Sequence, residues 1–158
     1  MSARITVPVV LVAALAVSAV PAHAAKPKPK KPITQTYDLT LYPDPTVDVV
    51  GQIPGKAPVC GVLPQSKNEH PFTVPAAGTL SVHLVSPDPT PAAAPIHADW
   101  DLYVLGSDGS VIDGSSTAFA TESTTTKFKT KTPVNILVCN VAGETTGTVT
   151  LTYKYALI

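Results

Sequence analysis

Apolar and polar residues alternate with a period of two along much of this chain, as they do in a β-strand with one buried face. Residues 79–85 place Leu80, Val82 and Leu84 on one side and polar side chains on the other. Residues 148–155 repeat the pattern, and no stretch after the N-terminal region shows sustained helical spacing of apolar residues. The sequence therefore predicts an all-β, antiparallel fold.

Other segments supply the remaining strands. Residues 134–141 are apolar on both faces, which predicts a strand in the middle of a sheet. Residues 99–112 predict a strand, a tight turn at Asp108-Gly109 and a second strand, and Asp113-Gly114 predicts another turn. Further strands are expected at 36–42, 70–74 and 122–130, a short hairpin link at 143–147, and an exposed proline-rich connection at 86–95.

The N-terminal region carries an export signal. Residues 7–20 are almost entirely apolar, and Pro21-Ala-His-Ala24 offers small residues at the two positions that a signal peptidase recognises. We expect residues 1–24 to be a signal peptide cleaved after Ala24, so that the protein is secreted, because the apolar run is too short for a stable membrane span. A Lys/Pro-rich linker follows at 25–32, and residues 33–158 form a single domain.

The linker has two interpretations, and the domain after it is acidic. Four lysines between alternating prolines suit a solvated spacer, or a basic arm that touches anionic wall polymer or lipid headgroups. The whole chain has 11 basic and 11 acidic residues. Arg4 and the four linker lysines account for five of the basic residues, so the domain has six basic and eleven acidic residues. The domain has no arginine, so nucleic acid is not expected as a partner.

Cys60 and Cys139 are the two cysteines of the chain. In an exported protein they predict one intramolecular disulfide, which would tie the early part of the domain to a central strand. Two buried thiols or an intermolecular link are the alternatives. The bridge would be a structural link and not a redox centre, because the cysteines are far apart and lack a CxxC context.

Catalytic motifs are missing from the sequence. It has no GxSxG, no HExxH, no phosphate-binding GxxxxGK and no dinucleotide glycine pattern. His70, His83 and His97 could meet a serine and an aspartate in space, but their positions suit solvated or turn-packing histidines better. We therefore do not expect an enzyme.

Asp99 and Asp101 are the candidate metal ligands. Two positions apart on one strand, they point to the same face, near Asp108 and Asp113, and could offer hard oxygen ligands to calcium. The alternative is a structural role in capping the strand and its turns, since an exposed pair of carboxylates tolerates mutual repulsion at small cost. A retaining glycosidase would also need two carboxylates, but in a cleft. The tyrosines Tyr37, Tyr42 and Tyr103 could contact a ligand or be ordinary strand residues, while Trp100, Leu102 and Val104 are expected in the core.

Residues 69–155 carry a series of short segments in a set order, of which Asp99-Trp-Asp-Leu-Tyr-Val104 is the most specific. The other segments, in order, are His70-Pro-Phe-Thr-Val74, Gly78-Thr-Leu-Ser-Val82, Gly109-Ser-Val-Ile112, Glu122, residues 133–141 and Gly147-Thr-Val-Thr-Leu151. With these segments in this order, the region resembles the bacterial pre-peptidase C-terminal domain family. The resemblance implies a jelly-roll-like β-sandwich that is non-catalytic and usually attached to secreted peptidases and other hydrolases.

Two departures from this family bear on function. Related collagen-binding modules bind calcium through acidic residues, several of them in the N-terminal linker, whereas this linker is basic and Asp38 is the first acid after it. The chain also carries no catalytic domain, so an accessory role would operate in trans, for example on a secreted peptidase. We expect a secreted, monomeric, non-catalytic accessory or binding module that acts at the cell envelope or on extracellular protein or polysaccharide. The alternatives are a structural cell-wall protein attached through its basic arm and, third, a small secreted hydrolase.

Overall fold

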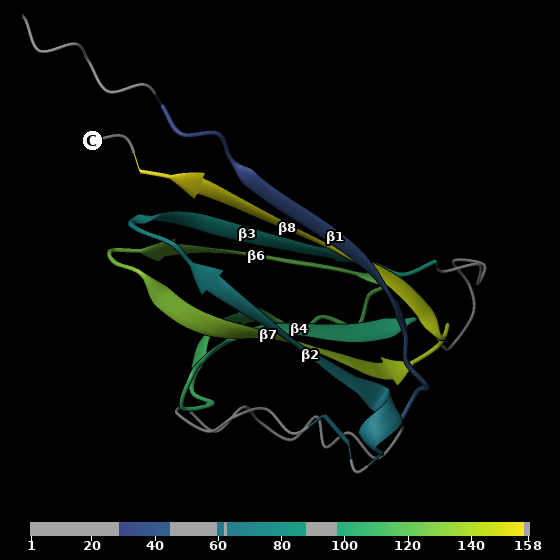
Figure 1. Ribbon diagram of the computed structural model, residues 1–158. Coiled ribbons are helices and arrows are strands. Elements are labelled where there is room, and N and C mark those ends of the chain that lie inside the picture. The colour runs from purple at the N-terminus through teal and green to yellow at the C-terminus, as the bar shows by residue number, and fades with distance from the viewer. Residues whose placement is uncertain (1–28, 45–59, 62, 88–97, 157–158) are drawn as a thin grey trace, which may run out of the picture.

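The computed structural model describes residues 29–44, 60–61, 63–87 and 98–156, which form two packed antiparallel sheets (Figure 1). Sheet A has the strand order β1-β8-β3-β6, and sheet B has the order β2-β7-β4-β5. The strands are β1 (Ile33–Thr40), β2 (Lys67–Val74), β3 (Gly78–Val85), β4 (Asp99–Gly106), β5 (Val111–Ser115), β6 (Thr121–Phe128), β7 (Thr132–Ala142) and β8 (Thr146–Tyr155), and a short 3-10 helix, η1 (Pro64–Ser66), precedes β2.

This strand order is that of an eight-stranded jelly roll, so the predicted all-β, jelly-roll-like sandwich is confirmed. Apart from β4 and β5, successive strands alternate between the sheets, and the chain passes repeatedly from one layer to the other. Each expected strand is present, but β1 and β2 begin three residues earlier than the sequence pattern indicated, and β1 and β6 each end two residues earlier, at Thr40 and Phe128. Among the described residues, no helix is long and apolar enough to cross a membrane.

The core fills the space between the two sheets. Leu80, Val82 and Leu84 face inward from β3, as predicted, and they meet the fully buried Trp100 and Leu102 of β4. The other buried members of the core are Leu39, Leu41, Phe72, Val74, Ala98, Val104, Val134, Ile136, Val138, Val149, Leu151 and Tyr153. These inward residues occupy alternate strand positions, which is why the period of two was a sound guide to the fold.

Strand β7 is buried on both faces, as its continuous apolar sequence predicted. It lies between β2 and β4, and its outward residues Leu137 and Cys139 form a second buried cluster with Cys60, Tyr103 and Leu105. Cys60 and Cys139 are joined by the predicted disulfide, with Cα atoms 5.3 Å apart. The bridge closes a sequence separation of 79 residues, so it restricts the unfolded chain and stabilises the fold.

Two sets of contacts close the sides of the sandwich. On one side the Tyr37 ring of β1 stacks on His70 of β2, with ring centroids 4.4 Å apart. On the other side the carboxylate of Glu122 in β6 is almost fully buried, and it accepts hydrogen bonds from the Ser115 hydroxyl and from the amide and hydroxyl of Thr117. Each contact joins an edge strand of one sheet to an edge strand of the other, or to the segment that follows it.

One turn prediction is confirmed and two are wrong. Residues 143–147 do not form a hairpin link, because β7 and β8 belong to different sheets and β8 already begins at Thr146. Gly109 has a φ of 79° and its amide donates to the Gly106 carbonyl at 3.0 Å, so Asp108-Gly109 forms the β4–β5 turn. Asp113 and Gly114, in contrast, lie inside β5. Gly114 is needed there because of close packing and not because of a turn: a Cβ atom at this position would lie 2.5 Å from Cδ1 of Tyr103.

Several predictions fall outside the described residues. They are the signal peptide with its cleavage after Ala24, the first part of the linker, most of the connection at 86–95, and His97. Lys30 to Pro32 at the end of the linker are exposed, and β1 starts directly after them.

Candidate binding face

Asp99 and Asp101 lie at the start of β4 and flank Trp100, whose side chain is buried in the core. The alternation of the strand therefore directs both carboxylates to the outer side of sheet B, as predicted. Asp101 is not exposed as expected: it is only 9% exposed, lies opposite Cys139 in the register, and accepts a hydrogen bond from the Tyr103 hydroxyl at 3.2 Å. Its burial follows from the apolar cluster around the disulfide, which the pattern of β4 alone does not reveal.

Both carboxylates hold their protons more tightly than usual. Burial raises the pKa of Asp101 to about 6; the Tyr103 hydrogen bond opposes the shift, and the Asp99 and Glu122 carboxylates add to it. Burial and the charge of Glu122 also raise the pKa of Asp99. The pair is thus a partly desolvated, mutually repelling set of charges, which a bound cation would relieve.

The other two predicted acidic ligands lie elsewhere. Asp108 is in the turn that follows β4, at the other end of this strand from the pair, and accepts hydrogen bonds from the amide and hydroxyl of Ser110. Asp113 points toward β6, where the Thr126 hydroxyl donates to it at 2.8 Å. Among the described residues, no three His, Cys, Asp or Glu side chains form a metal-binding group. The pair supplies two of the six to eight oxygen ligands that calcium takes, so calcium binding at Asp99 and Asp101 stays a prediction.

The histidines and tyrosines are spread over different faces. His83 is exposed on the outer face of sheet A, as predicted, and is therefore on the opposite side of the sandwich from Asp99 and Asp101. Tyr103 is buried beside the disulfide, so a role in surface ligand contact is wrong for this residue. Tyr42 is 57% exposed. The stack with His70 leaves Tyr37 half-buried, and this burial raises its pKa.

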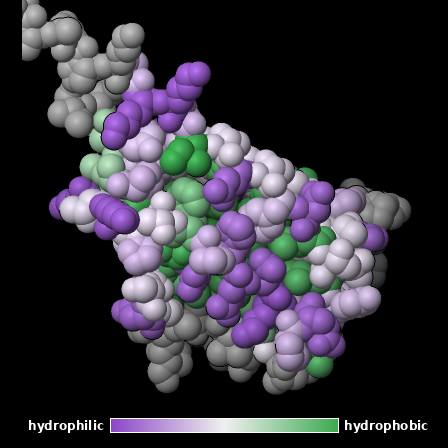
Figure 2. Space-filling model, viewed as in Figure 1, coloured by the Kyte–Doolittle hydropathy of each residue, from purple (hydrophilic) through white to green (hydrophobic). Residues whose placement is uncertain are grey.

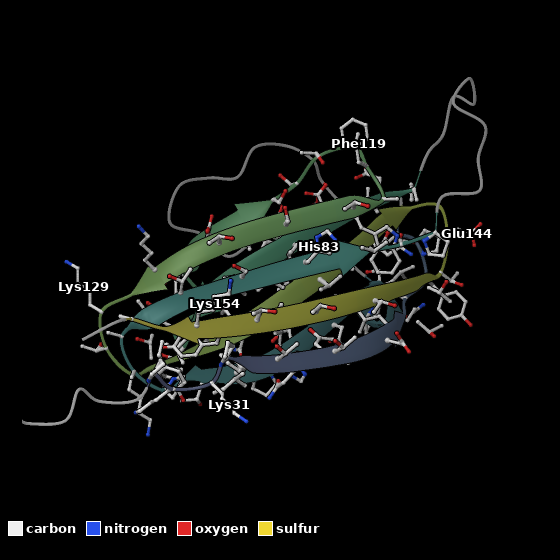
Figure 3. All side chains as sticks on the ribbon, turned by 90° about the horizontal axis from the view of Figure 1, so that it is seen from above. Lys31, His83, Phe119, Lys129, Glu144 and Lys154 are labelled. Atoms are coloured by element: carbon white, nitrogen blue, oxygen red, sulfur yellow. A yellow bond between two sulfur atoms is a disulfide. The ribbon has the colours of Figure 1, made fainter. Side chains whose placement is uncertain are left out.

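The outer face of sheet A is lined by hydroxyl groups, and we call it the hydroxyl face (Figure 3). Threonine suits these positions because its branched side chain packs well along a strand while its hydroxyl stays in water. Sequence alternation assigned Thr79, Ser81 and His83 to such a surface, but only the strand order shows that four such strands lie together. The Ser and Thr residues of this face are Thr34, Thr36, Thr40, Thr79, Ser81, Thr121, Ser123, Thr125, Thr146, Thr148, Thr150 and Thr152.

The register arranges these side chains in rows across the four strands. One row is Thr34, Thr152, Ser81 and Thr125, and the next is Thr36, Thr150, His83 and Ser123. Neighbours in a row are about 4.8 Å apart, and successive rows on one face are about 6.7 Å apart. The hydroxyls meet across the strands, with Oγ1 atoms of Thr36 and Thr150 3.3 Å apart, and Ser81 Oγ and Thr125 Oγ1 3.1 Å apart.

The edge of the hydroxyl face near the start of β6 is apolar. Val85, at the end of β3, is 42% exposed, and Phe119, just before β6, is 66% exposed. The Ser86 amide donates to the Ala120 carbonyl at 2.8 Å, which brings the ends of β3 and the loop before β6 together. An exposed aromatic ring thus lies beside a flat array of hydroxyls, a combination that can contact both the apolar and the polar groups of a ligand.

No family model matches the chain, and no curated protein sequence matches it.

Proposed function

We propose that this protein is a secreted, non-catalytic binding module that recognises extracellular polysaccharide through the hydroxyl face of sheet A. The observation that carries the proposal is the pair of adjacent rows of Ser and Thr hydroxyls on an exposed sheet, with Phe119 at its border. Each hydroxyl is both a donor and an acceptor, as is each hydroxyl of a sugar. A flat array of such groups can form many weak contacts with an extended chain.

Secretion and the class of module are supported by the sequence. The export pattern of residues 1–24 and the disulfide suit an extracellular protein, and the resemblance to pre-peptidase C-terminal domains implies a β-sandwich without catalysis. An extracellular protein, such as a peptidase served in trans, is the alternative ligand. We favour polysaccharide because the hydroxyl face is polar and has its large apolar residues only at its border.

The two remaining alternatives differ from this proposal in where they place the function. A hydrolase built on Asp99, Asp101 and a histidine would need these groups to converge, and His83 lies on the opposite outer face from the aspartates. A structural wall protein would be attached through its lysine arm, with no role for the hydroxyl face. The proposal therefore predicts that binding depends on sheet A.

Pull-down with insoluble neutral polysaccharides tests this dependence. Replacing Thr150 and Thr152 together by valine keeps the shape of the side chains and removes two central hydroxyls, and we expect weaker binding. Thr73→Val, at an exposed position of β2 in sheet B, is the matched control and should bind as the wild type does. Phe119→Ala should also weaken binding. Equal binding by all four proteins would overturn the hydroxyl face as the binding surface.

A further inference from the structure

The lysines of the domain are gathered at one end of the sandwich. Of the seven lysines that the structure describes, six lie where β3 and β7 begin and where β6 and β8 end, and all six are exposed. We call this region the basic end. Its members are Lys30, Lys31, Lys127, Lys129, Lys131 and Lys154.

The basic end continues the hydroxyl face. Lys154, Thr79 and Lys127 are register partners on β8, β3 and β6, so they form the row next to Thr152 and Ser81. The two lysines flank Thr79 at a separation of about two strand spacings, roughly 9.6 Å between Cα atoms. A chain lying along the hydroxyl rows would therefore meet lysine ammonium groups at this end.

The linker reaches the sandwich at the same place. Nζ of Lys30 lies 5.0 Å from the ring centroid of Tyr155, a cation–π contact at the end of β8. Lys31 follows, and in Figure 3 it lies with Lys129 and Lys154 on one side of His83, while Glu144 lies on the other side. Figure 2 shows hydrophilic side chains where the N-terminal segment meets the sandwich. The charges of the arm and of the domain thus belong to one surface.

These lysines are not neutralised by described carboxylates. Lys67 in β2 pairs with Glu69, with Nζ and Oε1 3.7 Å apart, and this is the only ion pair among the residues that the structure describes. Asp108 lies at the basic end of the sandwich, in sheet B, where its carboxylate accepts hydrogen bonds from the amide and hydroxyl of Ser110. Most described acidic residues lie toward the opposite end: Asp38, Asp44, Asp99, Asp101, Glu122 and Glu144.

We propose that the basic end selects an anionic polysaccharide, one with carboxylates along its chain, and orients it along the hydroxyl face. This inference rests on the proposed function and names the charge class of the polymer. Lysine is a suitable partner because it is a compact, mobile charge that follows irregularly placed anions without bidentate geometry. The acidic opposite end repels the same polymer, so that only one direction of approach is favourable.

A lipid surface is a poorer match than a polymer. Membrane attachment of a folded domain needs apolar side chains beside the charges. The large exposed hydrophobic residues Tyr42, Leu63, Val85 and Phe119 lie toward the acidic end. Ile112 lies near the basic end, but on the edge strand of sheet B, in the other layer from the lysines of β6 and β8. Among the described residues, the hydroxyl face itself therefore has no large exposed apolar side chain at its basic end.

The test uses the full mature chain and immobilised polygalacturonate, which carries a carboxylate on every sugar. Replacing Lys127 and Lys154 together by glutamine should weaken binding about tenfold at low salt, because each exposed charge contact contributes modestly. Added salt should reduce the difference. Lys67→Gln is the matched control and should bind like the wild type, and the unfolding midpoints of all three proteins should agree.

Neutral polysaccharide and anionic vesicles complete the test. The lysine variant should keep the wild-type affinity for the neutral polymer, whereas Thr150→Val with Thr152→Val should lose affinity for both polymers. Wild-type binding of polygalacturonate by the lysine variant, or stronger lysine-dependent binding to phosphatidylglycerol vesicles, would overturn the inference. If the protein with Thr150→Val and Thr152→Val binds both polymers like the wild type, while the lysine variant binds polygalacturonate more weakly, the proposed function of the hydroxyl face fails and the lysine site stands.

Discussion

At the scale of single residues, Asp101 is an ionisable group held in an apolar setting, and this makes stability depend on pH. Its pKa is about 6 in the folded protein against an ordinary 3.8, so the folded state binds the proton more tightly than the unfolded state. Stability that depends on this proton is present below about pH 4 and is lost as the pH rises through about 6.

Asp101→Asn should therefore stabilise the protein at pH 8, by about 1–3 kcal/mol, and the gain should shrink toward zero as the pH falls below about 4. Urea unfolding at the two pH values measures it. Asp108→Asn is the control, because hydrogen bonds from Ser110 lower the pKa of Asp108 and favour its charged form. A gain from Asp101→Asn that is as large at pH 4 as at pH 8 would contradict the assignment.

Calcium would favour the charged forms of Asp99 and Asp101, which burial disfavours. A cation held by Asp99 and Asp101 stabilises their charged forms and binds only the folded protein, so the midpoint of thermal unfolding should rise in excess calcium compared with chelator. The rise should be absent in the double variant Asp99→Asn with Asp101→Asn. Equal midpoints for the wild type in calcium and in chelator would contradict calcium binding at Asp99 and Asp101.

At the scale of elements, the packing of β4 on β5 depends on one glycine beneath one aromatic ring. Gly114→Ala would place a methyl group 2.5 Å from Cδ1 of Tyr103 and 3.1 Å from the Leu102 carbonyl oxygen, so one strand must shift. We expect a loss of about 1–3 kcal/mol in the free energy of unfolding, measured in urea. In a Tyr103→Leu background the cost should be smaller, because the ring is gone. The same cost in both backgrounds would show that the ring is not the obstacle.

The same pair shows what the sequence could and could not predict. Periodicity identified the strands and the two-sided burial of β7 because each depends on residues close in the chain. Asp113-Gly114 has the composition of a turn, and only the ring of Tyr103 in the neighbouring strand explains why the glycine lies in a strand. Asp101 was expected to be exposed, and this was wrong because the alternation within β4 does not show which distant segments pack beside it. The cluster that buries Asp101 brings together Cys60, Tyr103 and Leu137 from such segments. The hydroxyl face likewise depends on strand order, which local patterns do not contain.

At the scale of the whole molecule, the jelly-roll order produces two outer faces of different character. Sheet B carries a buried apolar cluster and the disulfide on its outer side, whereas sheet A presents polar rows to solvent. The same order collects the ends of β6 and β8 with the start of β1, and this brings the lysines of the domain together with Lys30 and Lys31 at the end of the linker. For the proposed extended ligand, sheet A thus offers a polar face with a charged end.

The linker can be removed without cutting a strand, since β1 begins at Ile33. Deleting residues 25–32 from the mature chain should leave the unfolding midpoint nearly unchanged and should weaken binding to polygalacturonate in low salt, because four positive charges are lost. Binding to a neutral polysaccharide should stay as it is, because the hydroxyl face is intact. A structural wall protein attached only by its arm behaves differently: the same deletion would release it from the cell envelope altogether, and retention measured on whole cells separates the two accounts. Complete release, with binding to isolated polysaccharide also abolished, would place the function in the arm and leave sheet A with a structural role.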